Sequence, residues 1–262
     1  FVKTEFALQK SQNELDFVLL EEPENHLSHL NMKRLISKIN DSKNKQIFIA
    51  THSNLISSRL DLRNTILLNS NSNRPISLKD LEDSTANFFI KAPDNNILEF
   101  ILSRKVILVE GDAEYILLEK FFETITGQLP DEEDVHIISV GGTSFKRYLE
   151  ISKLLKIKTA VIRDNDGDFR KNCLHRYLSY VDKDIEIFYE MNNSISTFEI
   201  SIYQNNQNIC EDLFSPGRKT RTVQQYMLDE KADCAFELLA KKSEEISVPN
   251  YIKEAIEWLI KN

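Results

Sequence analysis

Residues 106–114 read VILVEGDAE, four apolar residues followed by three acids with a glycine among them. A short, continuous apolar run of this kind is typical of a buried parallel strand. Gly111 allows a tight turn from this strand into the helix that the following pattern predicts from Ala113 to Ile125. Glu110 would then stand at the strand end and Glu114 in the first turn of the helix, so we expect both carboxylates to face one point.

A second acidic cluster follows another apolar run about fifty residues later. Residues 160–168 read AVIRDNDGD, so that a predicted strand over 159–162 leads into Asp164 and Asp166. Carboxylates suit Mg²⁺ or Mn²⁺, and gathering them without a cation is electrostatically unfavourable. The alternative is a solvated acidic turn, but both clusters directly follow buried strands. The sequence therefore predicts a metal site that the two clusters share.

Strand and helix patterns alternate on both sides of these clusters. The alternation predicts an α/β fold with a mainly parallel sheet, whose sites lie at the carboxyl ends of the strands. We place a domain boundary in the transition at 92–104, with domains over 1–92 and 93–262. Further strands are expected at 17–20, 46–50, 65–68, 135–140 and 185–189, and further helices at 32–39, 95–103, 144–155, 232–244 and 250–261.

Composition limits the class of protein. The 262 residues carry a net charge of −8, from 33 Lys and Arg against 41 Asp and Glu, so nucleic acid must bind at a local site. Cys173, Cys210 and Cys234 stand far apart, which argues against structural zinc and for free thiols in a reducing cytoplasm. The chain begins with Phe1 and shows neither a signal peptide nor a membrane span, so we expect a fragment of a cytoplasmic bacterial protein.

The first domain has an acidic strand end of its own. The apolar run at 17–20 leads into Glu21 and Glu22, and the strand at 46–50 is followed by His52. Nucleotide hydrolases present one such carboxylate to Mg²⁺ and another to the attacking water. There is no GxxxxGK[ST] motif to hold phosphates, so we do not expect this chain alone to bind ATP. The alternative is that these are ordinary polar residues at strand ends.

Both acidic regions resemble known families. The strings EEPENHLSH and IFIATHS, from residues 21 and 47, resemble the Walker B, D-loop and switch-histidine region of ABC-type ATPases in the SMC, RecF and OLD group. The resemblance implies that Glu21 is the magnesium-side acid, Glu22 the catalytic base and His52 the switch residue. The pair VILVEGDAE and VIRDNDGD resembles the TOPRIM domain of topoisomerases, primases and OLD-family nucleases, over most of residues 104–240.

Further features match the OLD version of TOPRIM. These are the Gly141-Gly142 pair, Thr197-Phe198-Glu199, and Lys231-Ala232-Asp233 at the start of a helix. By resemblance, Glu199 would add a metal ligand and Lys231 would stabilise charge on the scissile phosphate.

The order of the two domains resembles that of OLD-family endonucleases, and the C-terminal segment looks most like the A subunit of Gabija anti-phage systems. The implied fold is the C-terminal part of an ABC-type ATPase domain followed by a Rossmann-like TOPRIM domain. The implied chemistry is two-metal hydrolysis of DNA with Mg²⁺ or Mn²⁺. In the intact protein, ATP would regulate cleavage, the chain would form dimers or tetramers, and a helicase is a possible partner.

The resemblance implies a role for each acid of the site. Catalysis would fall to Glu110, Asp164, Asp166 and Lys231. Asp112 and Asp168 would either bind the ions directly or hydrogen-bond to residues that do, and this alternative stays open. The ions would be held by Glu110, Glu114, Asp164, Asp166 and Glu199.

Local basic residues are the candidates for contacting DNA. Arg218, Lys219 and Arg221 form the most basic loop, and Arg170 and Lys171 follow the second acidic cluster. Two other functions stay open: a catalytically silent TOPRIM module that recruits a helicase, and an RNA-processing TOPRIM enzyme.

Overall fold

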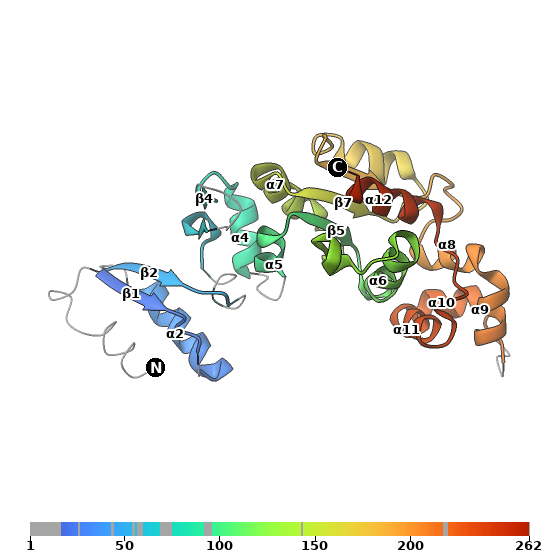
Figure 1. The fold of residues 1–262 in the computed structure, drawn as a ribbon, viewed down its shortest axis with the longest axis horizontal. Coiled ribbons are helices and arrows are strands. Elements are labelled where there is room, and N and C mark those ends of the chain that lie inside the picture. The colour runs from blue at the N-terminus through green and yellow to red at the C-terminus, as the bar shows by residue number, and fades with distance from the viewer. Residues whose placement is uncertain are drawn as a thin grey trace. The chain divides into compact units, whose positions relative to one another are not determined.

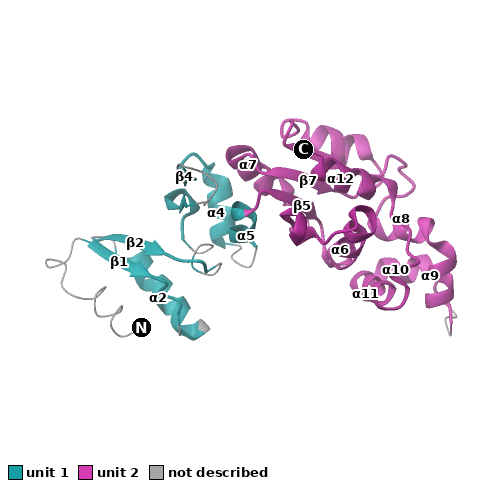
Figure 2. Cartoon of the chain, viewed as in Figure 1, with its two compact units in different colours: residues 1–102 teal, residues 103–262 magenta. Residues whose placement is uncertain are grey.

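The chain forms two compact units, residues 1–102 and 103–262, in a computed structural model (Figure 2). The structure describes residues 17–25, 27–42, 45–53, 56, 60–68, 75–91, 96–142, 144–216 and 220–261. The boundary predicted between residues 92 and 93 lies outside these ranges. Within them, no helix is long and apolar enough to span a membrane.

A four-stranded parallel sheet forms the centre of the second unit (Figure 1). Its strands are β5 (Lys105–Val109), β6 (Val135–Ser139), β7 (Lys158–Ile162) and β8 (Ile185–Phe188), in the order β6-β5-β7-β8. Each neighbouring pair is parallel, with Ile107 opposite both Ile137 and Ala160. The four carboxyl ends therefore meet at one edge, and the predicted α/β class is confirmed.

Successive residues of a strand point to opposite sides, so the apolar strands give this sheet two apolar faces. Helices cover both of them. On one face, Ile107 and Ala160 belong to a core that also includes apolar residues of α6 (Asp112–Thr126) and α12 (Asn250–Ile260). On the other face lies α7 (Phe145–Leu155), where the buried hydroxyl groups of Ser152 and Thr159 are 2.9 Å apart. Both faces are buried, as a parallel sheet requires.

Several helices of the second unit were not predicted from the sequence. They are short and separated by polar residues, so no long periodic pattern marks them. Their apolar residues nevertheless join the core around α6. These helices are α8 (Phe198–Asn205), α9 (Gln207–Phe214) and α10 (Val223–Asp229), followed by the predicted α11 (Lys231–Lys242), and a π-helical turn, η3, covers Arg170–His175.

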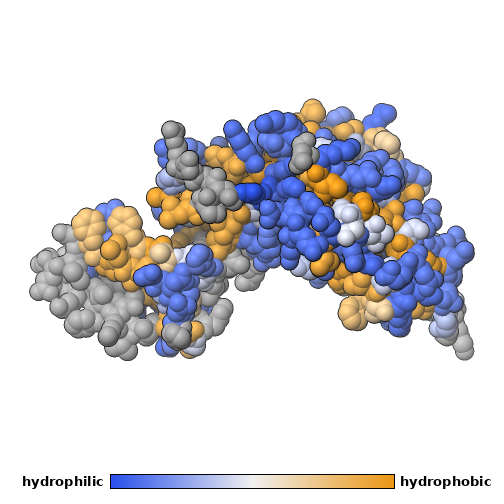
Figure 3. All heavy atoms as spheres, in the orientation of Figure 1, coloured by the Kyte–Doolittle hydropathy of each residue, from blue (hydrophilic) through white to orange (hydrophobic). Residues whose placement is uncertain are grey.

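The first unit contains two small sheets. β1 (Phe17–Glu21) pairs in parallel with β2 (Gln46–Ala50), and α2 (His29–Asp41) packs on one face of the pair. The strand expected at 17–20 is parallel, but Phe17 and Leu19 on its other face are 62 % and 78 % exposed, so the expectation that it is buried holds for one face only. In Figure 3, hydrophobic residues gather at this part of the first unit, whereas the visible face of the second unit is mainly hydrophilic.

The second small sheet is antiparallel, which corrects the prediction of a third buried parallel strand at 65–68. β3 (Ile66–Leu67) pairs with β4 (Ile76–Ser77), and Leu68 is 82 % exposed. A connection this short can join antiparallel strands, whereas parallel strands need a crossover of a dozen residues or more. The remaining elements of this unit are η1 (Leu62–Asn64), α4 (Asp83–Lys91) and α5 (Ile97–Leu102).

Candidate metal centre

The carboxyl edge of the large sheet brings the predicted acids of the second unit into one region. Glu110 directly follows β5, and Asp164 stands two residues beyond β7. The backbone N–H of Asp164 lies 3.4 Å from the Glu110 carboxylate, although the two residues are 54 positions apart. The glycine pair closes the same edge, because Gly142 adopts a φ of +106° and its N–H donates to the Glu110 carbonyl at 2.8 Å.

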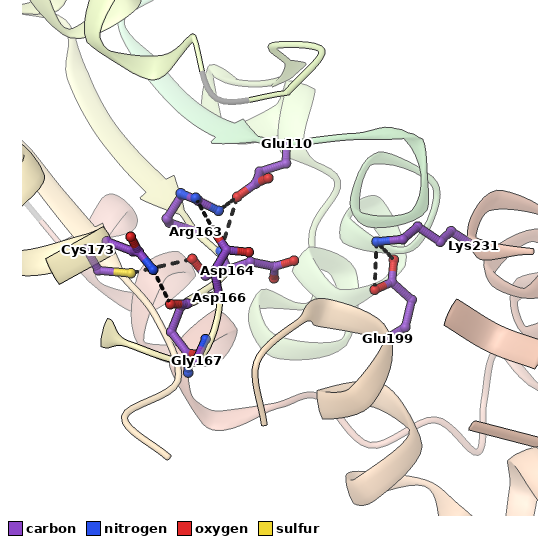
Figure 4. A network of polar contacts seen from close by, with 10 residues as sticks. Glu110, Arg163, Asp164, Asp166, Gly167, Cys173, Glu199 and Lys231 are labelled. Carbon is purple, nitrogen blue, oxygen red and sulfur yellow. Dashed lines mark hydrogen bonds and ion pairs between the residues drawn. The ribbon is translucent and has the colours of Figure 1, made fainter. Parts of the chain in front are cut away.

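Arg163 joins two of the acids (Figure 4). This side chain is 1 % exposed, and its guanidinium forms ion pairs with Glu110 and, at 2.6 Å, with Asp166. Arg163 was not among the residues predicted from the sequence. A basic residue between a buried strand and an acidic loop was the available signal, but its partner Glu110 lies 53 positions away and could not be identified from spacing alone.

Glu199 and Lys231 form a second ion pair, which Figure 4 shows apart from the Arg163 group. The Lys231 ammonium lies 3.0 and 3.1 Å from the two carboxylate oxygens of Glu199. Thr197 accepts a hydrogen bond from the N–H of Ile200 and so starts α8, which places Glu199 in its first turn. Glu199 is 4 % exposed, so Lys231 compensates a carboxylate that has little access to water.

The electrostatics of the acids show that they act on one another. Burial, together with the charges of Glu114 and Glu199, raises the pKa of Asp164 to about 8, whereas Lys231 and Arg163 oppose the rise. Burial also raises the pKa of Glu114, with a contribution from Glu199. Burial lowers the pKa of Lys231, but the adjacent Glu199 carboxylate outweighs this effect and the net pKa is raised.

These residues fit a divalent cation in their chemistry, but the acids are not gathered around one point. Their oxygen atoms are the ligands that Mg²⁺ and Mn²⁺ prefer, and a cation would relieve the repulsion that raises the pKa of Asp164. Within the described ranges, no three His, Cys, Asp or Glu side chains converge into a ready-made metal site. Glu110 is held by Arg163 and Glu199 by Lys231.

The loop that carries Asp164 and Asp166 is held from behind by Asn165, which is 1 % exposed. Its amide NH₂ donates to the carbonyls of Glu190, Asn192 and Ile195 at 2.7, 3.1 and 3.1 Å. Its amide oxygen accepts the N–H of Gly167 at 2.8 Å. Asn165 therefore sets the shape of the loop, while the carboxylate of its neighbour Asp166 pairs with Arg163 (Figure 4).

Tyr251 lies behind the acids and was predicted only as part of the C-terminal helix. This α12 residue is 5 % exposed, and its pKa is raised by burial and by the charges of Asp164 and Glu114.

Asp112 and Asp168 are exposed, and the Asp168 carboxylate accepts the N–H of Lys171 at 3.1 Å. That hydrogen bond gives Asp168 a local structural role at the start of the π-helical turn.

The predicted DNA-contacting residues differ in their surroundings. Arg218 and Lys219 lie outside the described residues. Arg221 pairs with Asp229 at 2.9 Å, so its charge is partly compensated. Arg170 and Lys171 are exposed directly after the acidic loop.

In the first unit, the structure brings two of the three predicted nucleotide-site residues together. β1 and β2 are parallel neighbours, so Glu22 and His52 follow adjacent strand ends. His52 Nε2 lies 3.6 Å from the Glu22 carboxylate, and Glu22 adopts a φ of +41°, which is uncommon outside glycine. Glu21 ends β1 with an exposed side chain.

Comparisons with known proteins agree with the geometry of the second unit. Residues 101–166 match the family described as "Overcoming lysogenization defect protein-like, TOPRIM domain", a range that includes four of the five predicted ion ligands. The resemblance to OLD-type TOPRIM domains is thereby confirmed for this segment.

Two curated relatives are similar to a larger part of the chain. It is 29 % identical over 168 residues to "Endonuclease GajA" of Bacillus cereus (strain VD045), and 27 % identical over 184 residues to "Old nuclease" of Escherichia phage P2. The alignments cover 63 % and 66 % of this chain but only 29 % and 31 % of the relatives.

Solved structures are also similar. The C-terminal region of the Burkholderia pseudomallei OLD protein gives a TM-score of 0.45 at 20 % identity, over 60 % of this chain and 96 % of that one. The C-terminal region of the Xanthomonas campestris pv. campestris OLD protein gives a TM-score of 0.43 at 24 % identity, over 62 % and 94 %.

Proposed function

Because residues 101–166 match an OLD-like TOPRIM domain, we propose that this chain is the nuclease-bearing part of a metal-dependent DNA endonuclease. The observation that carries the proposal is the electrostatic coupling of Glu114, Asp164 and Glu199 beside Lys231. A neutral or purely structural site has no need for three coupled acids with little access to water. The names of the two curated relatives, an endonuclease and a nuclease, support the same class of reaction.

The ion ligands we propose are Glu110, Glu114, Asp164, Asp166 and Glu199. Two divalent ions bound there would supply an activated water and stabilise the leaving oxygen of the phosphodiester. The Lys231 ammonium forms an ion pair with Glu199. It would donate to a non-bridging oxygen of the scissile phosphate, where a positive charge stabilises the transition state. Arg170 and Lys171 would hold the backbone of the DNA next to these acids.

We further propose that the first unit belongs to an ATPase domain that regulates cleavage in an oligomeric, cytoplasmic anti-phage protein of Gabija type. The pairing of Glu22 with His52 at adjacent strand ends supports a nucleotide site built from these residues and Glu21. ATP would act only in the intact protein, and a helicase partner is part of the same proposal.

The test is cleavage of supercoiled plasmid, linear DNA and RNA of the same sequence, with Mg²⁺, Mn²⁺ or EDTA. Two variants of α6 form a matched pair: Glu114→Gln removes a buried carboxylate, and Glu119→Gln removes an exposed one on the same helix. Because burial already favours the neutral form of Glu114, we expect its glutamine variant to fold. We expect Glu119→Gln to cut DNA in either metal, and Glu114→Gln to be inactive.

Each other outcome contradicts a defined part of the proposal. Cutting of RNA but not of DNA would contradict the substrate class. Cutting in EDTA would contradict the metal dependence, and full activity of Glu114→Gln would contradict the site. Absence of both cutting and DNA binding would favour the silent module that recruits a helicase, whereas DNA binding without cutting would contradict the expectation that this chain cuts DNA without the rest of its ATPase domain.

A further inference from the structure

Arg163 is the largest fully buried side chain of the described residues, and it stands among the proposed metal ligands. A charged guanidinium in the interior is unfavourable unless it is paired. Its charge is compensated by Glu110 and Asp166, and its Nε has no hydrogen-bond partner. The backbone also fixes its position, since the Arg163 N–H donates to the carbonyl of Phe188 in β8 at 2.9 Å.

The ion pair with Arg163 engages the same carboxylate that would bind a metal ion. Glu110 cannot pair fully with the guanidinium and also give its oxygens to a divalent ion, and a neighbouring positive charge repels that ion. In agreement with this competition, the acids do not converge, in the described residues, into a ready-made site. Lys231 cannot explain it for Glu110, because Lys231 pairs with Glu199.

We propose that Arg163 is a positioning residue that holds Glu110 and Asp166 in the metal-free chain and sets a low affinity for the divalent ion. The inference rests on the proposed metal-dependent function. Binding of the ion requires Glu110 to leave Arg163, so the energy of the ion pair is subtracted from the energy of metal binding.

The test is a Mn²⁺ titration of the 262-residue chain, followed by electron paramagnetic resonance of free Mn²⁺ and by calorimetry. Arg163→Met removes the charge at nearly constant volume, and Arg163→Lys keeps the charge but cannot contact two carboxylates in the same way. Arg104→Met is the matched control, because Arg104 precedes β5 at the opposite end of the strand from Glu110 and its side chain is 52 % exposed.

We expect Arg163→Met to bind Mn²⁺ about tenfold more tightly than the unchanged chain, Arg163→Lys to lie between them, and Arg104→Met to match the unchanged chain. Thermal unfolding gives a second readout. In EDTA, Arg163→Met should melt at a lower temperature, because two acids lose their cation, and Mn²⁺ should raise its melting temperature more than that of the unchanged chain.

Equal or weaker Mn²⁺ binding by Arg163→Met would overturn the inference while leaving the proposed function intact. If that variant folds only after Mn²⁺ is added, the inference is supported. If it never folds, Arg163→Lys decides, and an unchanged Mn²⁺ affinity in that variant overturns the inference. Absence of Mn²⁺ binding by both the unchanged chain and Arg163→Met would refute the metal-dependent function and the inference together.

Discussion

Raising the pH of the metal-free chain from 6 to 8 is expected to destabilise it through Asp164. Burial and neighbouring acids raise the pKa of this carboxyl from 3.8 to about 8 in the folded chain. The folded state therefore keeps a proton that the unfolded state releases. Stability from this group is fully present below pH 3.8 and is lost as the pH rises through about 8.

The size of the effect follows from these two pKa values. Each pH unit between them changes the free energy of unfolding by about 1.4 kcal/mol, and the change levels off near the folded-state pKa. Between pH 6 and pH 8 the Asp164 carboxyl thus removes about 2 kcal/mol of stability. Saturating Mg²⁺ should restore it, because the metal binds the ionised form and the folded state only.

Urea unfolding followed by tryptophan fluorescence measures this change. Trp258 is the only tryptophan, and its ring lies 5.8 Å from that of Phe188, so it reports on the second unit. Asp164→Asn should remove the slope between pH 6 and 8, whereas Asp131→Asn, an exposed aspartate of the same unit, should keep it. The five histidines are common to all three proteins, so their contribution cancels in the comparison. Parallel slopes for Asp164→Asn and the unchanged chain would refute the reasoning.

Three further predictions concern single side chains. Lys231→Met should lower the cleavage rate by about 10²–10³-fold in a single-turnover assay with DNA affinity changed less than threefold, because one donor to the phosphate is lost. Asn165→Ala should lower the free energy of unfolding by about 2–4 kcal/mol in urea titrations, because it removes the contacts of a buried amide with three carbonyls and one N–H, and a loss below about 0.5 kcal/mol would argue against its anchoring role. Replacing Arg170 and Lys171 with serine should weaken DNA binding and lower the slope of log affinity against log salt by about 1.8, and an unchanged slope would place the DNA elsewhere.

Sequence alone was sufficient for those parts of the site that local patterns encode. The apolar runs before Glu110 and Asp164 mark strand ends, and parallel strands bring such ends to the same edge of a sheet. The pairing of Glu22 with His52 follows from the same rule applied to β1 and β2. These positions needed no knowledge of how distant segments pack.

The missing parts depend on contacts between distant segments. Arginine is usually found at the protein surface, and only the folded chain shows that Arg163 is buried and paired with Glu110 and Asp166. The helices α8 to α10 are too short to show a reliable period, and their apolar residues are explained by the core they join. The exposed face of β1 could not be predicted, because an apolar run indicates burial but does not show which segment would cover each face of the strand.

The position of Asn165 separates the shape of the acidic loop from its chemistry. The amide holds the loop through main-chain partners, so the neighbouring acids do not have to maintain it. An exchange of Asp164 or Asp166 would therefore alter the charge of the loop without removing the contacts that Asn165 makes. Changing residue 165 has the opposite effect: both acids remain, but the contacts that hold the loop in shape are lost. The main-chain shape of the loop thus depends on the asparagine rather than on either acid beside it.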